Sequence, residues 1–228
     1  MTLEIIGTGS SGNCYLLTVE NQTLVIEAGV KFTKFKKSVN FDLSRIVGVL
    51  CTHAHGDHAE LIPILSKFGK NIYCTTGTAN DLNLKKWHSL PYSRPREIGI
   101  FKIISFETFH EGSEPCGFII EFNDKRLAFI TDTTHIKTKL ENIDYWLIEA
   151  NYSKTKLIES ELNIIVRQRI INSHMSIDMC ASILNASGGE KSELVILIHG
   201  SEKHSDKKEF LTKIPYAIIA ENGQKFEL

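Results

Sequence analysis

The chain has 228 residues, of which 42% are hydrophobic and 23% are charged, and its formal net charge is −1. This length and composition predict one globular domain over residues 1–228 and exclude a disordered chain. Because the charge is close to neutral, the chain as a whole does not attract nucleic acid, and any recognition of phosphate must be local.

The sequence carries no targeting or membrane signal. The N-terminus has no basic segment followed by a long apolar stretch, and no apolar run reaches the length of a membrane span. We therefore expect a cytoplasmic protein that makes no membrane contact. The five cysteines form no closely spaced pair, so we interpret them as buried thiols rather than as disulfide or zinc-binding pairs.

The first quarter of the chain alternates short apolar runs with turn residues, which predicts strands joined by tight turns. The predicted strands are Leu3–Ile6, Cys14–Val19, Leu24–Ile26 and Ile46–Leu50. Residues 31–37 carry four lysines around two phenylalanines. We interpret this segment as a solvated loop or helix face, with phosphate contact as the alternative.

Helix and strand patterns then follow in turn. We expect helices at Ala59–Phe68, interrupted or bent near Pro63, and at Thr78–Leu90, with a strand at Ile72–Thr75 between them. Further strands are expected at Ile98–Ile104, Phe106–His110, Cys116–Phe122 and Leu127–Thr131, with a hairpin turn at Asn123–Asp124.

The last third is predicted to contain strands at Tyr145–Ala150 and Leu194–Ile198 and a helix at Ile164–Ile170. Ser176 is a good N-cap for a second helix from Ile177 to about Ala186, which Gly188-Gly189 would end. Strands followed by strand–helix units, twice in succession, predict two sheets that face one another with helices outside.

The run Thr52–His58 places three imidazoles and a carboxylate in seven residues after an apolar strand. His53 and His55 are two apart, so on an extended chain they point to the same side and can bind one ion, while Asp57 and His58 can face a second ion. Neutral imidazole and carboxylate suit zinc, manganese or iron(II). A solvated histidine-rich loop is the alternative, but the run is neither repetitive nor terminal.

Two metals would need three more donors, each expected just beyond the carboxyl end of a strand. His110, Asp132 and His199 occupy such positions. Each alone is more often a turn or surface residue, but their joint recurrence indicates a shared site.

On these residues the chain resembles metallo-β-lactamase-fold hydrolases, from Gly7-Thr8-Gly9-Ser10-Ser11-Gly12-Asn13 through the His-x-His-x-Asp-His run to Ile198-His199-Gly200-Ser201. The resemblance implies an α/β (α+β) fold, an αββα sandwich in a single domain, with two divalent metal ions, zinc or in its place manganese. It also implies the ligand set: His53, His55 and His110 for the first metal, Asp57, His58 and His199 for the second, and Asp132 as the bridge.

Two further residues resemble a phosphodiesterase branch of these hydrolases. His174, in Asn172-Ser173-His174-Met175-Ser176, resembles the His-Ser-Thr element of RNase Z and the His-Leu-Ser-Asn element of the YycJ-like exonucleases. Glu149 resembles the acidic residue that orients this histidine. Without the resemblance, His174 is more simply a loop residue before a helix and Glu149 a surface carboxylate.

The resemblance implies a binuclear metal-dependent phosphodiesterase that hydrolyses a nucleotide phosphodiester, either a cyclic nucleotide or a nucleic acid end, by a metal-bridging hydroxide. We assign Asp57, His174 and Glu149 as catalytic, with His174 assisting departure of the leaving group. The alternatives are a YycJ-like DNA exonuclease specifically, an ester or lactone hydrolase of the same fold, and a non-catalytic nucleotide-sequestering binder.

The length leaves no room for the projecting arm of long RNase Z, the inserted domain of RNase J or the C-terminal domain of glyoxalase-type hydrolases. The compact core is similar to YycJ-like exonucleases and to phage phosphodiesterases that degrade cyclic nucleotide signals. The neutral charge slightly favours a small nucleotide. Related phosphodiesterases are often dimers, which implies a homodimer.

The chain departs from the family pattern at Glu27-Ala28-Gly29, where Asp-Ala-Gly is usual. That carboxylate normally supports the metal ligands from behind, so a longer side chain shifts it or changes the preferred metal. His204, in the polar loop after His199, is expected to be solvated, with contact to the substrate as the alternative.

Overall fold

The computed structural model describes residues 1–228. The chain forms two compact units: unit 1 consists of residues 1–105, 112–116 and 221–228, and unit 2 consists of residues 106–111 and 117–220. No helix is both long enough and apolar enough to cross a membrane. All five cysteines are buried and unpaired with one another, which confirms their interpretation as buried thiols.

The first sheet has seven strands in the order β14-β1-β2-β3-β4-β5-β6. They are β1 (Thr2–Gly7), β2 (Cys14–Val19), β3 (Gln22–Ile26), β4 (Ile46–Leu50), β5 (Ile72–Cys74), β6 (His88–Ser89) and β14 (Lys225–Glu227). Neighbouring strands from β14 through β1 and β2 to β3 pair antiparallel. Neighbouring strands from β3 through β4 and β5 to β6 pair parallel. The carboxyl ends of β3 and β4 therefore meet at one edge, which receives Glu27 and the histidine run.

Four short helices belong to unit 1: α1 (Phe32–Ser38), α2 (Gly56–Ala59), α3 (Ile62–Lys67) and α4 (Thr76–Asp81). The helix predicted over Ala59–Phe68 is interrupted close to Pro63, as one of the two expected forms has it: α2 ends at Ala59 and α3 begins at Ile62. The Leu61 N–H donates to the Ala28 carbonyl at 2.8 Å, and the Asp57 carbonyl, its helical partner, accepts from Asn13 N–H at 2.7 Å. These tertiary bonds end α2 and let α3 begin next to Pro63.

The helix predicted over Thr78–Leu90 is wrong, since α4 is shorter and begins earlier. Thr75 caps it by accepting a hydrogen bond from Thr78 N–H at 3.2 Å. Asn83 then adopts φ 52°, which ends the helical path before β6.

The second sheet has the order β13-β12-β11-β10-β9-β8-β7. Its strands are β7 (Arg96–Ile98), β8 (Phe101–Glu107), β9 (Cys116–Phe122), β10 (Lys125–Ile130), β11 (Tyr145–Glu149), β12 (Leu194–Ile198) and β13 (Ala217–Ile219). Strands β10 to β13 are parallel. Their shared edge receives the residues that follow β10, β11 and β12.

Two strand predictions in this region need correction. The stretches Ile98–Ile104 and Phe106–His110 are not two separate strands, because the chain turns at Gly99, with φ 58°, and then runs through β8 without a break to Glu107. The predicted hairpin at Asn123–Asp124 is confirmed, with φ of 44° and 59° at the two turn residues.

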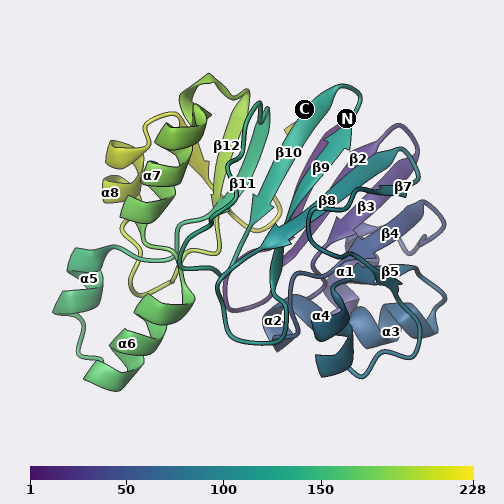
Figure 1. The fold of residues 1–228 in the computed structure, drawn as a ribbon, viewed down its shortest axis with the longest axis horizontal. Helices are drawn as coiled ribbons and strands as arrows, with labels where there is room; N and C mark the ends of the chain where they lie inside the picture. The colour runs from purple at the N-terminus through teal and green to yellow at the C-terminus, as the bar shows by residue number, and fades with distance from the viewer. The chain divides into compact units, whose positions relative to one another are not determined.

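Unit 2 contains helices α5 (Lys154–Glu159), α6 (Ile164–Ser173), α7 (Ile177–Ser187) and α8 (Lys207–Lys213), and a 3-10 turn at Gly189–Lys191. In Figure 1, α7 and α8 lie alongside the sheet strands of this unit, whereas α5 and α6 lie apart from them. The predicted caps of α7 are confirmed: Ser176 Oγ accepts from Met179 N–H at 3.2 Å, and Gly188 ends the helix at φ 70°.

Candidate metal centre

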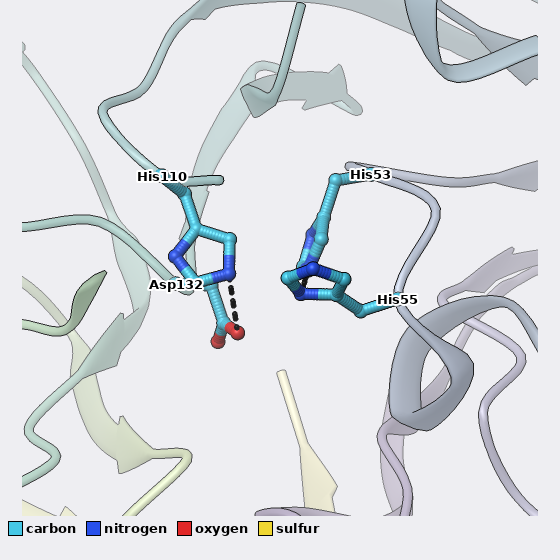
Figure 2. Close-up of side chains that lie close together, drawn as sticks. All are labelled: His53, His55, His110 and Asp132. Carbon is cyan, nitrogen blue, oxygen red and sulfur yellow. Dashed lines mark hydrogen bonds and ion pairs between the residues drawn. The ribbon is translucent and has the colours of Figure 1, made fainter. Parts of the chain in front are cut away.

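The histidine run leaves β4 as an extended loop in unit 1. His53 Nε2 and His55 Nδ1 face each other at 3.1 Å, as the dashed contact between these two side chains marks in Figure 2. His53 Nδ1 lies 2.9 Å from Thr52 Oγ1. Two ligands bound at about 2.0–2.1 Å to one tetrahedral ion lie about 3.3 Å apart, so this imidazole pair fits a divalent metal.

Glu27 supports the histidine run from behind. Its Oε1 accepts a hydrogen bond from Thr52 N–H at 3.0 Å, and its Oε2 lies 3.3 Å from His58 Nδ1, with both side chains fully buried. Burial raises the pKa of Glu27, and the contacts with His58 and Thr52 oppose that rise. The longer carboxylate thus still contacts the histidine, and it leaves His58 Nε2 as the ring nitrogen available for a metal.

Asn13, in the glycine-rich motif before β2, supports the segment that carries Asp57. Its Nδ2 lies 3.1 Å from His58 Nε2 and 3.1 Å from the Asp57 carbonyl oxygen, while its Oδ1 accepts from Gly9 N–H at 2.9 Å. Asp57 Oδ2 lies 3.5 Å from His58 Nε2. A Cβ at Gly29 would lie 1.8 Å from the Asp57 carbonyl oxygen, so only glycine permits this approach.

In unit 2, Asp132 follows β10 and contacts two imidazoles with its two oxygens. Oδ1 lies 3.2 Å from His199 Nδ1, and Oδ2 lies 3.5 Å from His110 Nε2, a contact dashed in Figure 2. His110 Nδ1 donates to the Ser173 carbonyl at 2.7 Å, which leaves Nε2 as the available nitrogen. Burial lowers the pKa of His110, which favours the neutral ring that a metal requires.

Two predicted metal ligands and the supporting residue Glu27 have left-handed backbones. Glu27, Asp132 and His199 have φ of 62°, 44° and 53°, in the left-handed region that few residues other than glycine adopt; aspartate and histidine adopt it more often than glutamate does. Such strain costs on the order of 1–3 kcal/mol and concentrates at functional sites. No sequence signal indicates it.

Glu149 and His174 form a buried pair. Glu149 Oε1 lies 2.8 Å from His174 Nδ1 and 3.4 Å from His199 Nδ1, while Oε2 accepts from Thr133 N–H at 3.0 Å and Met175 N–H at 3.2 Å. Burial raises the pKa of Glu149, but its contacts with His174 outweigh this and leave that pKa lowered. For His174 the two effects have the opposite signs. Burial lowers the pKa of the imidazole, the interaction with Glu149 raises it by more, and the pKa of His174 is therefore raised.

These residues form one donor group within unit 2. One ligand atom from each of Asp132, Glu149, His174 and His199 lies within 4.8 Å of the others. Asn151, which the sequence analysis missed, donates from Nδ2 to the His199 carbonyl at 2.9 Å. Its place two residues after Glu149 was the only available signal.

Glu149→Ala is expected to lower the free energy of unfolding by about 3–5 kcal/mol, because it leaves two amides and two imidazoles without their buried carboxylate. Denaturant titration measures the loss. The matched control is Glu141→Ala, which removes an exposed carboxylate paired with Lys139 and is expected to change stability by less than about 0.5 kcal/mol. Equal stability of the two variants would contradict a structural role for Glu149.

The expectation that His204 is solvated is wrong. The side chain is buried, and its Nδ1 lies 3.1 Å from Ser201 Oγ, while its carbonyl accepts from Ser153 N–H at 2.9 Å. His204 therefore holds the loop after His199 against the start of α5. His135 stacks on Phe109, with ring centroids 4.2 Å apart.

A model of the beta-lactamase superfamily domain matches residues 23–199. The exodeoxyribonuclease WalJ of Streptococcus pneumoniae is 26% identical over 224 residues, which cover 90% of this chain and 83% of the relative. The exodeoxyribonuclease YycJ of Bacillus anthracis is 23% identical over 184 residues, covering 74% and 70% respectively. The crystal structure of the metallo-beta-lactamase fold protein YhfI from Bacillus subtilis matches with a TM-score of 0.79 at 17% identity, over 99% of both chains.

Proposed function

Because the chain belongs to the beta-lactamase superfamily, we propose that it is a binuclear metal-dependent phosphodiesterase that hydrolyses a nucleotide phosphodiester. Membership confirms the resemblance found in the sequence, and the match to YhfI confirms the metallo-β-lactamase fold class. Homologues named as exodeoxyribonucleases support a hydrolase that acts on nucleic acid.

The pairing of His174 with Glu149 is the observation that carries the phosphodiesterase proposal. An ester or lactone hydrolase of this fold needs the metal ligands but has no need for a second histidine held by a buried carboxylate. Here Glu149 contacts His174 Nδ1 at 2.8 Å, and the His174 side chain remains 22% exposed. This leaves Nε2 as the atom that can meet a substrate.

Seven side chains fit two divalent ions by their chemistry, since they are imidazoles and carboxylates only. We propose that His53, His55 and His110 hold one ion, that Asp57, His58 and His199 hold the other, and that Asp132 bridges them. When bound, zinc or in its place manganese would act as a Lewis acid toward the phosphate and lower the pKa of a shared water.

The residues around the ligands have distinct tasks in this proposal. Glu149 orients His174 and favours its protonated form, and His174 Nε2 then gives a proton to the oxygen that leaves phosphorus. Glu27 orients His58 through Nδ1, and the Ser173 carbonyl orients His110 through Nδ1. Asp57, which the sequence analysis assigns both as a catalytic residue and as a metal ligand, acts in this proposal as a metal ligand.

The end of a DNA strand is the substrate that the relatives favour, and a cyclic nucleotide is the second candidate. A panel tests the choice: single-stranded DNA, single-stranded RNA, cyclic mononucleotides, bis-nitrophenyl phosphate and a lactone, each with zinc and with manganese. We expect turnover of phosphodiesters only. Turnover of the lactone alone would replace the proposal with an ester hydrolase, and binding without turnover would replace it with a nucleotide-sequestering protein.

We also propose that the chain forms a homodimer, with α6 as the contact. Ile164, Ile165 and Ile171 on this helix are 72%, 77% and 43% exposed. An isolated helix of ten residues is marginal in water, so a second copy that covers these side chains would stabilise it. Sedimentation equilibrium tests the proposal: we expect a dimer that Ile165→Lys dissociates, and a monomeric wild type would contradict it.

A further inference from the structure

A second surface of unit 1 lies outside the predicted metal ligands and has not been assigned a role. It is formed by α1, the loop after it and the end of α3, and we call it the basic–aromatic surface. Its members are Lys31, Phe32, Lys34, Lys36, Lys37, Phe41, Lys67 and Phe68. The chain is close to neutral as a whole, so this gathering of five lysines in one small region is a local charge.

Phe41 is the most unusual member of the surface. Its side chain is 70% exposed, and its φ of 60° follows a φ of 50° at Asn40, so two successive residues adopt the left-handed region. For a bulky side chain this conformation is a clear outlier, and glycine would adopt it without strain. Neither burial nor backbone preference therefore explains a phenylalanine at this position.

The loop holds Phe41 in place. Phe41 N–H donates to the Lys36 carbonyl at 2.8 Å, and Lys70 Nζ donates to the Leu43 carbonyl at 2.7 Å. Behind the loop, Phe35 is fully buried and anchors α1 to the core of unit 1. These contacts fix the backbone of the loop that bears the exposed Phe41 ring.

Lys36 lies between two aromatic rings of this surface. Lys36 Nζ lies 5.0 Å from the ring centroid of Phe32 and 5.8 Å from that of Phe41. The Phe32 ring lies 5.6 Å from the ring of Phe68, which is 53% exposed. An ammonium group thus lies between two aromatic rings, and exposed rings beside positive charge are the groups on which single-stranded nucleic acid stacks and to which its phosphates bind.

We propose that the basic–aromatic surface binds single-stranded DNA through base stacking on Phe41 and Phe68 and phosphate contacts with the lysines around them. The choice of DNA rests on the proposed function. A single strand fits better than a duplex, because only unpaired bases expose their faces to the rings. A membrane is disfavoured because α1 has only seven residues and turns Phe35 into the core, which leaves no broad apolar face.

The first test compares the effect of one substitution, Phe41→Gly, on oligonucleotide affinity with its effect on folding stability. Zinc-loaded protein is titrated against a fluorescein-labelled, phosphorothioate-linked thymidine oligonucleotide of about 20 nucleotides, which resists hydrolysis. Phe41→Gly is expected to weaken binding by about tenfold, since stacking on an aromatic side chain has roughly that effect. The same variant is expected to unfold at a denaturant midpoint no lower than the wild type, because glycine relieves the strained backbone.

The second test concerns charge. Lys34→Gln/Lys37→Gln is expected to weaken binding and to reduce the slope of log Kd against log salt by about 1.4, or 0.7 for each lost phosphate contact. The matched control is Lys85→Gln/Lys86→Gln, an exposed pair in the same unit outside the basic–aromatic surface, which is expected to bind as the wild type does.

Three outcomes would overturn the proposal: no oligonucleotide binding by the wild type, equal binding by wild type and Phe41→Gly, or an equal loss in the control pair. Binding to vesicles containing anionic phospholipid, in place of the oligonucleotide, would assign the surface to a membrane and also overturn it. Hydrolysis of bis-nitrophenyl phosphate by the wild type reports separately on the proposed function, so failure of the enzyme and failure of this surface are distinguishable.

Discussion

Asp132→Ala is expected to remove phosphodiester hydrolysis and to lower the metal affinity of the protein by more than about 100-fold. The reason is its position: the two oxygens of one carboxylate contact His199 Nδ1 at 3.2 Å and His110 Nε2 at 3.5 Å. Loss of a residue that only orients a ligand weakens metal binding by about 10–100-fold, and loss of the proposed bridging ligand is expected to exceed that. Elemental analysis of the purified variant and its turnover of bis-nitrophenyl phosphate measure both effects.

Two variants make this prediction specific to Asp132. Asp132→Asn keeps the shape but removes the charge, and it is expected to lose metal nearly as fully. Asp178→Ala removes a partly exposed carboxylate of the same unit that pairs with Lys154 and Lys213, and it is expected to keep wild-type metal content and turnover. An Asp132→Ala variant with wild-type metal content would show that the carboxylate is not a ligand.

His174→Ala is expected to lower kcat by about 10²–10⁴ on an oligonucleotide, the range that general acid catalysis contributes. The loss is expected to be smaller on bis-nitrophenyl phosphate, because nitrophenolate leaves without needing a proton. Metal content is expected to remain that of the wild type, since we assign no ligand role to His174. Steady-state rates on both substrates measure the difference between them.

His135→Ala is the matched control for His174, because His135 is a half-buried histidine of the same unit that stacks on Phe109. It is expected to retain turnover on both substrates. An equal loss on both substrates in His174→Ala would assign His174 to positioning rather than proton transfer. Unchanged turnover on both would remove the main support for a phosphodiesterase.

Strands were predictable from the sequence where burial is continuous. The runs Cys14–Val19, Ile46–Leu50, Cys116–Phe122 and Leu194–Ile198 match observed strands, because short apolar segments bounded by turn residues have few other ways to bury themselves. Helices in unit 1 were predicted poorly. Their ends are set by hydrogen bonds to distant residues, such as Leu61 N–H to the Ala28 carbonyl, which no local pattern records.

In the candidate site, too, some features were predictable from local sequence and others depend on contacts between distant residues. Residue types and strand ends suggested the metal ligands, because a histidine run after a buried strand is chemically unusual. Only the fold could show that Glu27, which is one methylene longer than the usual aspartate, still contacts His58 at 3.3 Å. Asn13 and Asn151 were missed for a similar reason, since an asparagine that donates to the backbone carbonyl of a site residue has no signature of its own.

Hydrolysis of bis-nitrophenyl phosphate by metal-stripped protein, measured as zinc or manganese is added back, tests the two-metal phosphodiesterase proposal most directly. The expected result is no turnover without metal and a rate that rises to a plateau at about two ions per chain. Turnover that persists in the stripped protein, or a rate that reaches its plateau at about one ion per chain, would contradict it.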